Sequence, residues 1–568
     1  MRVLHLMKSL IKLPMKIFKP FLIVTTAAIV LTGCGSSVAP ILSTPISNID
    51  TLPLKVTPTE GDALKTWGAA DLVTDTIPGM SVDKAYNEIL NTRKGSNVIV
   101  AVIDSGIDIE HEDLKNVIWV NKDEIPNNGK DDDKNGYVDD IHGWNFLGDI
   151  VAENLEYARY IKKLGPKFKG KPEASISAAD REDYAMYKKA LAEYEKEVQE
   201  ATANKTRYEG ILSQVKPAHA AMSKKLAKKD YTKKDLTNIK NPSEAEQQQI
   251  GLLSQMLGFA DTVPEAIEQL NGGVEYFGGR LETHFNLEKN YRAMLGDNPD
   301  DITDTNYGNN DVDGPDPKKE DAMHGTHVAG IIAAQRNNSV GMNGVASNVE
   351  IMVIRAVPDG DEYDKDIALA IRYAVDNGAK VINTSFGKYY SPNPEWVWDA
   401  IKYASDNDVL IVNAAGNEGI DLDTVQVYPN DQKGTGGEVG DTFITIGALN
   451  YKYGSEMVAN FSNYGVSNVD LFAPGVKIWA TTPLDNYRYL QGTSMASPGV
   501  AGVAAVIRSH YPKLSAKQVK QVLMDSGLSS SSPVMLGGDE SNTNNFNKIS
   551  KSGKMANLYN ALIMASKM

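Results

Sequence analysis

The feature that most constrains this chain is a repeated alternation of short, β-branched apolar runs with longer amphipathic segments. The apolar runs occupy residues 96–103, 349–357, 379–385, 409–413 and 442–448. Helical periodicity follows at residues 364–377, 394–405 and 515–525. Continuous β-branched runs are typical of strands buried on both faces, and their alternation with helices favours a parallel sheet. We therefore predict an α/β fold built around a mostly parallel sheet.

A block of different character separates the first of these runs from the others. Within it, apolar side chains recur at steps of three and four, the stripe expected of a helix: Tyr184, Tyr187, Leu191, Tyr194 and Val198. We predict a mainly α-helical insertion over residues 148–300, which divides the α/β part into residues 67–147 and 301–568. Residues 216–240 carry eight lysines against two aspartates. A solvated helix face is the first interpretation of that segment, and a docking patch for an acidic surface is the second.

The N-terminus has the pattern of an export signal. Five basic side chains precede the apolar segment 21–31, which is too short to make a good membrane span. The segment leads into Leu31-Thr32-Gly33-Cys34, which resembles the lipobox of bacterial lipoproteins. We expect residues 1–34 to be a lipoprotein signal peptide, Cys34 to be lipidated and residues 35–66 to form a flexible tether. The resemblance implies a bacterial cell-envelope protein held at the membrane by its lipid. A plain secretory signal is the alternative.

The net charge and the cysteine content limit which binding partners and which stabilising bonds this chain can have. The formal net charge is −15 at pH 7, which opposes general binding to nucleic acid, because phosphate backbones are recognised by basic surfaces. Cys34 is the only cysteine in the chain, so intrachain disulfides are excluded as a stabilising device.

Four polar side chains stand where predicted strands end or predicted helices begin. They are Asp104 after residues 96–103, His324 at the start of residues 324–330, Asn417 after residues 409–413, and Ser494 within residues 492–498. Ligands of open α/β sheets bind at the carboxyl ends of the strands, so these groups can meet at one edge. An acid, an imidazole and a hydroxyl are the groups of a nucleophilic triad.

In the order Asp, His, Ser, these motifs resemble the subtilisin-like serine proteases, or subtilases (peptidase family S8). The resemblance covers residues 67–148 and 309–568, and the strings at 324–330 and 492–498 are nearly identical to the family's signatures. It implies a three-layer sandwich and a serine endopeptidase that hydrolyses proteins or peptides through an acyl-enzyme. It requires no cofactor for the chemistry. The alternatives are a non-catalytic binding or scaffolding lipoprotein and a narrow-specificity processing protease.

The resemblance also implies a role for each motif residue. Ser494 would be the nucleophile, His324 the general base and then acid, and Asp104 the group that orients the imidazole. Asn417 would donate its amide to the oxyanion, together with the backbone N–H of Ser494. His327 lacks the histidine and glutamate spacing of zinc proteases, so we expect a packed or locally hydrogen-bonded ring.

Substrate contacts follow from the same resemblance, in which an extended peptide pairs with exposed strand edges. The matching residues are Ser385, Phe386 and Gly387, then the less secure segment 360–363, and finally Gly416 and Glu418 beside the pocket for the residue that precedes the cleaved bond. Acidic side chains at these places favour basic residues near the cleavage site. The other interpretation is that the acidic segment 360–363 only keeps the protein surface soluble.

Residues 131–140 are rich in oxygen ligands at alternate positions, followed by a glycine. This part resembles the start of an EF-hand-type calcium loop, with ligands predicted at Asp131, Asp133, Asn135 and Asp139. The glutamate expected at position twelve is missing, because His142 stands there, so Asp139 or Asp140 would have to substitute for it. A structural Ca²⁺ and an acidic turn without metal both remain open.

Overall fold

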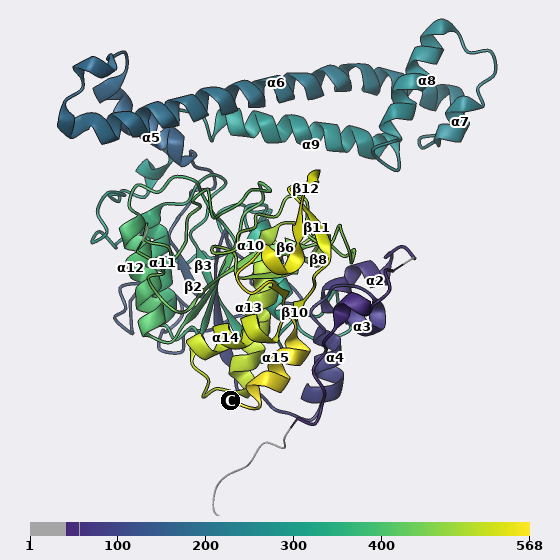
Figure 1. Cartoon of the computed structure of the whole chain (residues 1–568). Helices are drawn as coiled ribbons and strands as arrows, with labels where there is room; N and C mark the ends of the chain where they lie inside the picture. The colour runs from purple at the N-terminus through teal and green to yellow at the C-terminus, as the bar shows by residue number, and fades with distance from the viewer. Residues whose placement is uncertain (1–40, 56, 435) are drawn as a thin grey trace, which may run out of the picture. The chain divides into compact units, whose positions relative to one another are not determined.

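The computed structural model describes residues 41–55, 57–434 and 436–568 (Figure 1). Residues 43–568 form one compact unit. The predicted signal peptide over residues 1–34, with Cys34, lies outside the described residues. Among the residues that are described, no helix combines the length and the apolar character needed to cross a lipid bilayer.

A nine-stranded sheet forms the centre of this unit. In spatial order the strands are β10 (Leu528–Ser529), β13 (Lys554–Met555), β7 (Leu471–Pro474), β6 (Phe443–Leu449), β5 (Leu410–Ala414), β4 (Val381–Thr384), β1 (Val98–Asp104), β3 (Val349–Arg355) and β2 (Gly143–Asn145). Every neighbouring pair is parallel except β10 with β13. The predicted mostly parallel sheet is confirmed, and β1, β4, β5 and β6 are buried along almost their whole length, as continuous apolar runs require.

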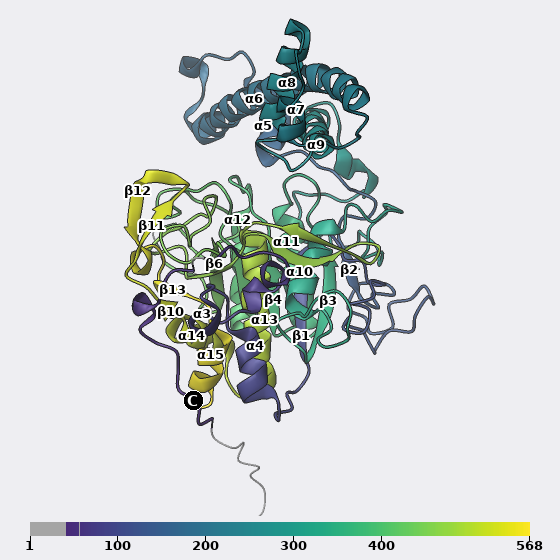
Figure 2. The same cartoon turned by 90° about the vertical axis from the view of Figure 1, so that its right-hand side faces the viewer.

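Helices cover both faces of this sheet and complete the predicted three layers (Figures 1 and 2). One face carries α11 (Asp364–Asp376) and α12 (Pro394–Asp406), and the other carries α10 (Met323–Ala333), α13 (Thr493–His510) and α14 (Ala516–Ser526). Because α13 is rich in glycine and alanine, it lies close to five strands of the sheet, and nearly all of its residues are buried. Its first turn is thereby fixed at the edge where the strands end.

The chain around these layers forms smaller elements. Before β1 they are η1 (Ile49–Thr51), α2 (Asp62–Lys65), η2 (Trp67–Ala69), α3 (Leu72–Asp75), α4 (Val82–Ala85) and the π-turn η3 (Tyr86–Leu90). Later come two antiparallel hairpins, β8 (Ile478–Thr482) with β9 (Asn486–Leu490) and β11 (Pro533–Leu536) with β12 (Asp539–Asn545). The chain continues through η7 (Phe546–Lys548) and ends with α15 (Leu558–Ala565).

The predicted tether over residues 35–66 is wrong for the part around η1. Ile49 is 2 % exposed, the N–H of Ile46 donates to the Asn560 side chain (2.8 Å), and Asp50 accepts a hydrogen bond from Ser530 (2.6 Å). Low periodicity suggested a mobile segment, but these groups find partners on elements that lie at the far end of the sequence.

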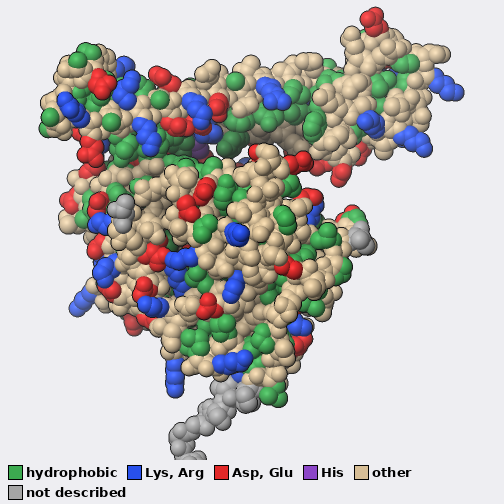
Figure 3. Space-filling model, in the orientation of Figure 1, with side chains coloured by type: hydrophobic (Ala, Val, Ile, Leu, Met, Phe, Trp, Pro, Cys, Tyr) green, Lys and Arg blue, Asp and Glu red, His purple; other side chains and the backbone are tan. Residues whose placement is uncertain are grey.

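The block between β2 and α10 is helical, as predicted. It contains α5 (Glu156–Phe168), η4 (Glu173–Ser175), η5 (Ala178–Asp180), α6 (Arg181–Leu226), α7 (Lys233–Thr237), α8 (Glu244–Met256), α9 (Val263–Glu282) and η6 (Tyr291–Met294). The long α6 packs against α9 as a hairpin (Figures 1 and 2). All eight lysines of residues 216–240 are exposed, and Figure 3 shows basic side chains around this end of the hairpin, as a solvated face would have them. The limits 148–300 remain a prediction.

Candidate active site

Asp104 and His324 form a directly bonded pair where β1 ends. The Asp104 carboxyl is almost fully buried, and its Oδ1 accepts hydrogen bonds from the Ser105 N–H (2.8 Å) and from His324 Nδ1 (2.7 Å). The imidazole stands on the first turn of α10 and keeps 39 % of its side chain exposed. Burial lowers the pKa of His324, but the charge of Asp104 and the hydrogen bond to it outweigh that effect and leave the pKa raised. The hydrogen bond at Nδ1 therefore orients the ring.

Ser494 lies on the first turn of α13, and α10 and α13 pack against each other and against β1. Its hydroxyl donates to the Ser385 carbonyl (3.1 Å), and its own carbonyl accepts from the Ser385 hydroxyl (2.9 Å). The Ser494 hydroxyl is thus held by the Ser385 carbonyl. The packing brings all three predicted triad residues to the carboxyl edge of the sheet.

Two N–H groups flank the space in front of Gly492. Asn417 accepts hydrogen bonds at Oδ1 from the Thr493 N–H (2.8 Å) and hydroxyl (3.1 Å), so its Nδ2 is turned the other way. A side-chain carbon at Gly492 would lie 3.5 Å from that Nδ2 and 3.6 Å from the Ser494 nitrogen. Glycine, which also accommodates the φ of 150° found here, keeps this space free. The arrangement suits an oxygen that becomes negatively charged.

The predicted substrate edge is braced from behind by buried polar groups. Asn383, at the end of β4, donates to the Ser385 hydroxyl (2.9 Å) and accepts from Ser497 on α13 (2.9 Å). Phe386 is half-buried and Gly387 is exposed. The next residue, Lys388, pairs with Tyr428 through both backbone groups (2.9 Å each). The edge over residues 385–387 is thus open on one side and fixed on the other.

Gly416 and Glu418 lie beside Asn417, and their contacts also hold it in place. The Gly416 N–H donates to the Thr493 hydroxyl (3.0 Å). The Glu418 carboxylate accepts from the Asn463 side chain (2.9 Å), and burial and a hydrogen bond to Glu418 raise the pKa of Tyr389. A side-chain carbon at Gly416 would stand 2.9 Å from Glu418 Oε2. Glu418 is therefore held in place beside Gly416 and Asn417.

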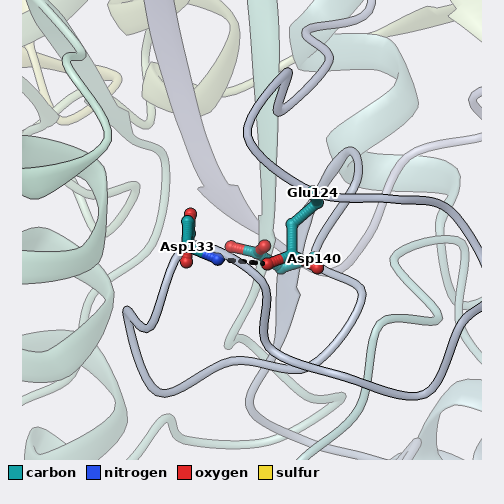
Figure 4. A group of neighbouring side chains, drawn as sticks. All are labelled: Glu124, Asp133 and Asp140. Atoms are coloured by element: carbon teal, nitrogen blue, oxygen red, sulfur yellow. Dashed lines mark hydrogen bonds between the residues drawn. The ribbon is translucent and has the colours of Figure 1, made fainter.

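The predicted metal ligands are only partly brought together. Asp133 belongs to a group with Glu124 and Asp140, one carboxylate oxygen of each lying within 4.8 Å of the others (Figure 4). Asn135 reaches this group as an amide donor to Asp133 and Asp140. In contrast, the Asp131 carboxylate accepts the N–H groups of residues 135 and 136, and that of Asp139 accepts those of residues 128 and 129. Among the described residues, Asp133 thus lies in a carboxylate cluster with Glu124 and Asp140, whereas Asp131 and Asp139 lie outside that cluster.

Comparison with known proteins places these observations in a family. The model of the Subtilase family matches residues 95–202 and 213–552, most of the chain. The chain belongs to the subtilase family. The thermophilic serine proteinase of Bacillus sp. (strain AK1) is 42 % identical over 187 residues, which are 33 % of this subtilase and 42 % of that protein. Subtilisin DY of Bacillus licheniformis is 38 % identical over 206 residues, 35 % of this chain and 68 % of the relative.

Other relatives are matched over a somewhat larger share of this chain. The cell wall-associated protease of Bacillus subtilis (strain 168) is 35 % identical over 237 residues, or 42 % of this subtilase and 24 % of that protein. This subtilase thus spans less than half the length of two of its curated relatives. A cold adapted subtilisin-like serine proteinase of known crystal structure shares 28 % identity, covering 42 % of this chain and 74 % of the other, with a TM-score of 0.32.

Several residues that support the site of this subtilase were given no role from the sequence. Thr493 orients Asn417, and Asn383 with Ser497 braces Ser385. Thr493 and Ser497 lie inside the motif 492–498, so the motif itself was the available signal. His327 is buried and bonded through Nε2 to two backbone carbonyls, as predicted for a packed ring. No sequence pattern pointed to Glu124, because it lies upstream of the acidic loop over residues 131–140.

Proposed function

We propose that this subtilase is a serine endopeptidase that uses Asp104, His324 and Ser494. The observation that carries the proposal is the 2.7 Å hydrogen bond between the buried Asp104 and His324, at the sheet edge where α13 presents Ser494. Asn417 supports it, because Thr493 turns its Nδ2 toward the space in front of Gly492.

The reaction follows from these positions. The Ser494 hydroxyl attacks the scissile carbonyl while His324 takes its proton at Nε2, and Asp104 stabilises the imidazolium that forms. The N–H groups of Asn417 and Ser494 bind the oxygen as its charge develops. His324 then protonates the leaving amine, and water releases the acyl group by the reverse sequence. For subtilisin itself, the loss of one such donor costs about 10²–10³ in kcat.

Protein and peptide substrates would bind as extended chains along residues 385–387, with residues 360–363 as a second edge. Glu418, a fixed charge beside Gly416, favours a basic residue near the cleaved bond. Cleavage of a degenerate peptide library tests this preference. We expect enrichment of Lys and Arg in the wild type and loss of that enrichment in Glu418→Gln. Equal profiles of the two proteins would remove the role of Glu418.

A fluorophosphonate probe separates the enzyme from a non-catalytic binding lipoprotein. We expect one probe per chain on Ser494, no labelling of Ser494→Ala, and full labelling of Ser541→Ala, whose serine lies on the exposed β12. Absence of labelling in a folded wild type would favour the binding protein. A narrow-specificity processing protease, the other alternative, would be labelled but would cleave few members of the peptide library.

We also propose that Cys34 is lipidated and that the enzyme is held in the bacterial cell envelope by this lipid. The support is the sequence of residues 1–34, with basic side chains, a short apolar segment and the terminal Leu-Thr-Gly-Cys. Mass spectrometry of the mature protein is expected to find a lipid-modified N-terminal Cys34. Cys34→Ala should abolish membrane retention. A mature N-terminus at another residue would refute the anchor.

A further inference from the structure

The first inference concerns three buried or half-buried carboxylates in the loop between β1 and β2. Glu124, Asp133 and Asp140 bring one carboxylate oxygen each to within 4.8 Å of the other two (Figure 4). Their hydrogen-bond donors are neutral groups: the amides of Asn121 and Asn135, the Tyr373 hydroxyl, and the N–H groups of Asp132 and Asp133. In the part of the chain that the structure describes, none of these carboxylates forms an ion pair with a Lys, Arg or His side chain.

One oxygen atom of this cluster has no hydrogen-bond partner among the described residues. Glu124 is 5 % exposed, and its Oε1 accepts two backbone N–H groups, but its Oε2 is buried without a hydrogen bond. A buried carboxylate oxygen left unpaired carries a large desolvation cost, which a cation can offset. Glu124 also supplies the carboxylate that the acidic loop lacks at its twelfth position, where His142 stands.

We propose that Glu124, Asp133 and Asp140 bind one Ca²⁺ ion. Ca²⁺ takes six to eight oxygen ligands in flexible geometry, and this loop offers carboxylates, side-chain amides and backbone carbonyls. Mg²⁺ prefers a compact octahedron that keeps several waters. The ion would fasten the loop to β2, which follows Asp140 closely, and to Tyr373 on α11. Its role is structural, since the acidic loop contributes no group to the proposed catalytic machinery.

Calcium binding can be measured on the full chain with Ser494→Ala, which prevents self-digestion. Isothermal titration with CaCl₂ is compared between this protein and the same chain carrying Glu124→Gln. Glu112→Gln, a carboxylate outside the cluster, serves as the matched control. We expect one site per chain, at least tenfold weaker affinity in Glu124→Gln and unchanged affinity in Glu112→Gln.

The stability and binding measurements together decide whether the calcium site exists. A melting temperature that rises with CaCl₂ in the parent and the control, but not in Glu124→Gln, supports the site. No binding by the folded parent at millimolar Ca²⁺, or equal binding by Glu124→Gln, overturns it. Should Glu124→Gln not fold, Asp133→Asn replaces it, because Asp133 is only half-buried.

A second inference rests on a different observation, the buried charges where the insertion joins the sheet. Lys388 comes directly after the substrate edge 385–387 and is 3 % exposed. Its ammonium group donates to Glu156 Oε2 on α5 (3.0 Å), to Asp364 Oδ1 (2.9 Å) and to the Glu362 carbonyl (2.7 Å). Glu156, Asp364 and Glu362 are each at most 4 % exposed.

Arg159, one turn along α5, reaches the second substrate segment. It pairs with Glu156 and donates to the carbonyls of Asp361 (2.7 Å) and Glu362 (3.1 Å). The Asp361 carboxylate in turn accepts the N–H of Glu156 (2.6 Å). The first turns of α5 therefore fasten both proposed substrate edges, and they belong to the insertion.

We infer that Glu156 and Arg159 are positioning residues for the extended substrate. This inference rests on the proposed function and adds that the insertion forms the back of the substrate cleft. Loss of the Glu156 charge leaves Lys388 without its α5 partner and frees both edges to move. Binding of a long peptide then suffers, while the reactivity of Ser494 toward a small probe does not.

The test compares two readouts in Glu156→Gln. We expect KM for a tetrapeptide nitroanilide to rise at least tenfold, and the rate of fluorophosphonate labelling of Ser494 to change less than twofold. Glu156→Asp should restore part of the KM effect. Glu193→Gln, an exposed change on α6, should leave both values as in the wild type.

The two proposals can fail separately. A wild type that is not labelled by fluorophosphonate fails the proposed function. A labelled, cleaving wild type with an unchanged KM in Glu156→Gln fails the positioning role, and so does a parallel loss of labelling and cleavage. If Glu156→Gln does not fold, the KM of Arg159→Lys decides in the same way.

Discussion

Buried carboxylates have different partners in two regions of the molecule. One region is the base of the insertion, where Glu156 and Arg159 of α5 meet Asp364 and Lys388. The other is the acidic loop between β1 and β2, with Glu124, Asp133 and Asp140. At the base, Glu156 contacts two cations of the protein, Arg159 and Lys388. In the loop, Asp140 contacts only neutral donors. Burial alone raises the pKa of both groups, but the charges of Arg159 and Lys388 lower the pKa of Glu156 to about 2, whereas burial raises that of Asp140 to about 6. At the base, the buried carboxylate thus has cationic partners, whereas the donors to Asp140 among the described residues are neutral.

The largest effect on stability is expected when Lys388, the cation at the centre of the base of the insertion, is replaced. Lys388→Met leaves Glu156 and Asp364 buried beside one charge fewer, and breaking such a pair costs about 3–5 kcal/mol of unfolding free energy. Urea unfolding in the Ser494→Ala background measures this loss. The double change Glu156→Gln with Lys388→Met should recover part of it. A loss below about 1 kcal/mol would show that the base does not depend on charge balance.

Calcium withdrawal is expected to act next most strongly, and only on the loop. A ligand present at a hundredfold excess over its Kd stabilises the folded state by about 2.7 kcal/mol. Addition of EGTA should therefore lower the unfolding free energy of the parent by about that amount. It should have no effect on Glu124→Gln, while Lys388→Met should respond as the parent does. A similar response to EGTA in Glu124→Gln would place the ion elsewhere.

Alkaline pH should act on Glu362, a buried carboxyl whose charge the neighbouring cations do not balance. Burial raises the pKa of Glu362 to about 8, against an attraction to Lys388, so this group holds its proton at neutral pH. A raised folded-state pKa means that the stabilisation is present at low pH and is lost as the pH rises through 8. Between pH 7 and 9 the loss is about 1.4 kcal/mol.

Chemical denaturation at pH 7 and pH 9 compares the parent with Glu362→Gln. The variant should be free of this pH dependence, so the difference between the two proteins isolates Glu362 from the other groups that titrate. Parallel slopes in both proteins would contradict the raised pKa.

The sheet and the proposed catalytic residues were predictable because their signals are local. The β-branched run before Asp104 predicts a buried strand, and the observed β1 ends at that residue. Residues 364–377 predicted a helix, and α11 spans Asp364–Asp376. The motif around Ser494 likewise needs no knowledge of distant parts. Each of these predictions depends on residues that are neighbours in sequence.

The clusters compared above were not predictable because they join distant segments. Lys388 meets Glu156 across 232 positions, and no spacing rule connects them. Glu124 lies outside the ten-residue loop whose pattern indicated calcium, so a prediction made from that loop could not include it. The segment around Ile49 was predicted to be a tether for the same reason, since its partners Asn560 and Ser530 lie near the other end of the chain.

The smallest effect on stability is expected at an ion pair that, unlike the pairs at the base of the insertion, is exposed to solvent. Lys163 on α5 pairs with Asp300 at 2.7 Å, and both side chains are 59 % exposed. Water and salt screen such an exposed pair, and both side chains lose rotational freedom when they form it. The pair therefore contributes at most about 0.5 kcal/mol to the unfolding free energy. Lys163→Ala should change the urea midpoint within error and leave KM for the tetrapeptide unchanged, although the residue stands one turn beyond Arg159. A loss comparable to that of Lys388→Met would mean that the whole of α5, and not its buried first turns, sets the position of the substrate edges.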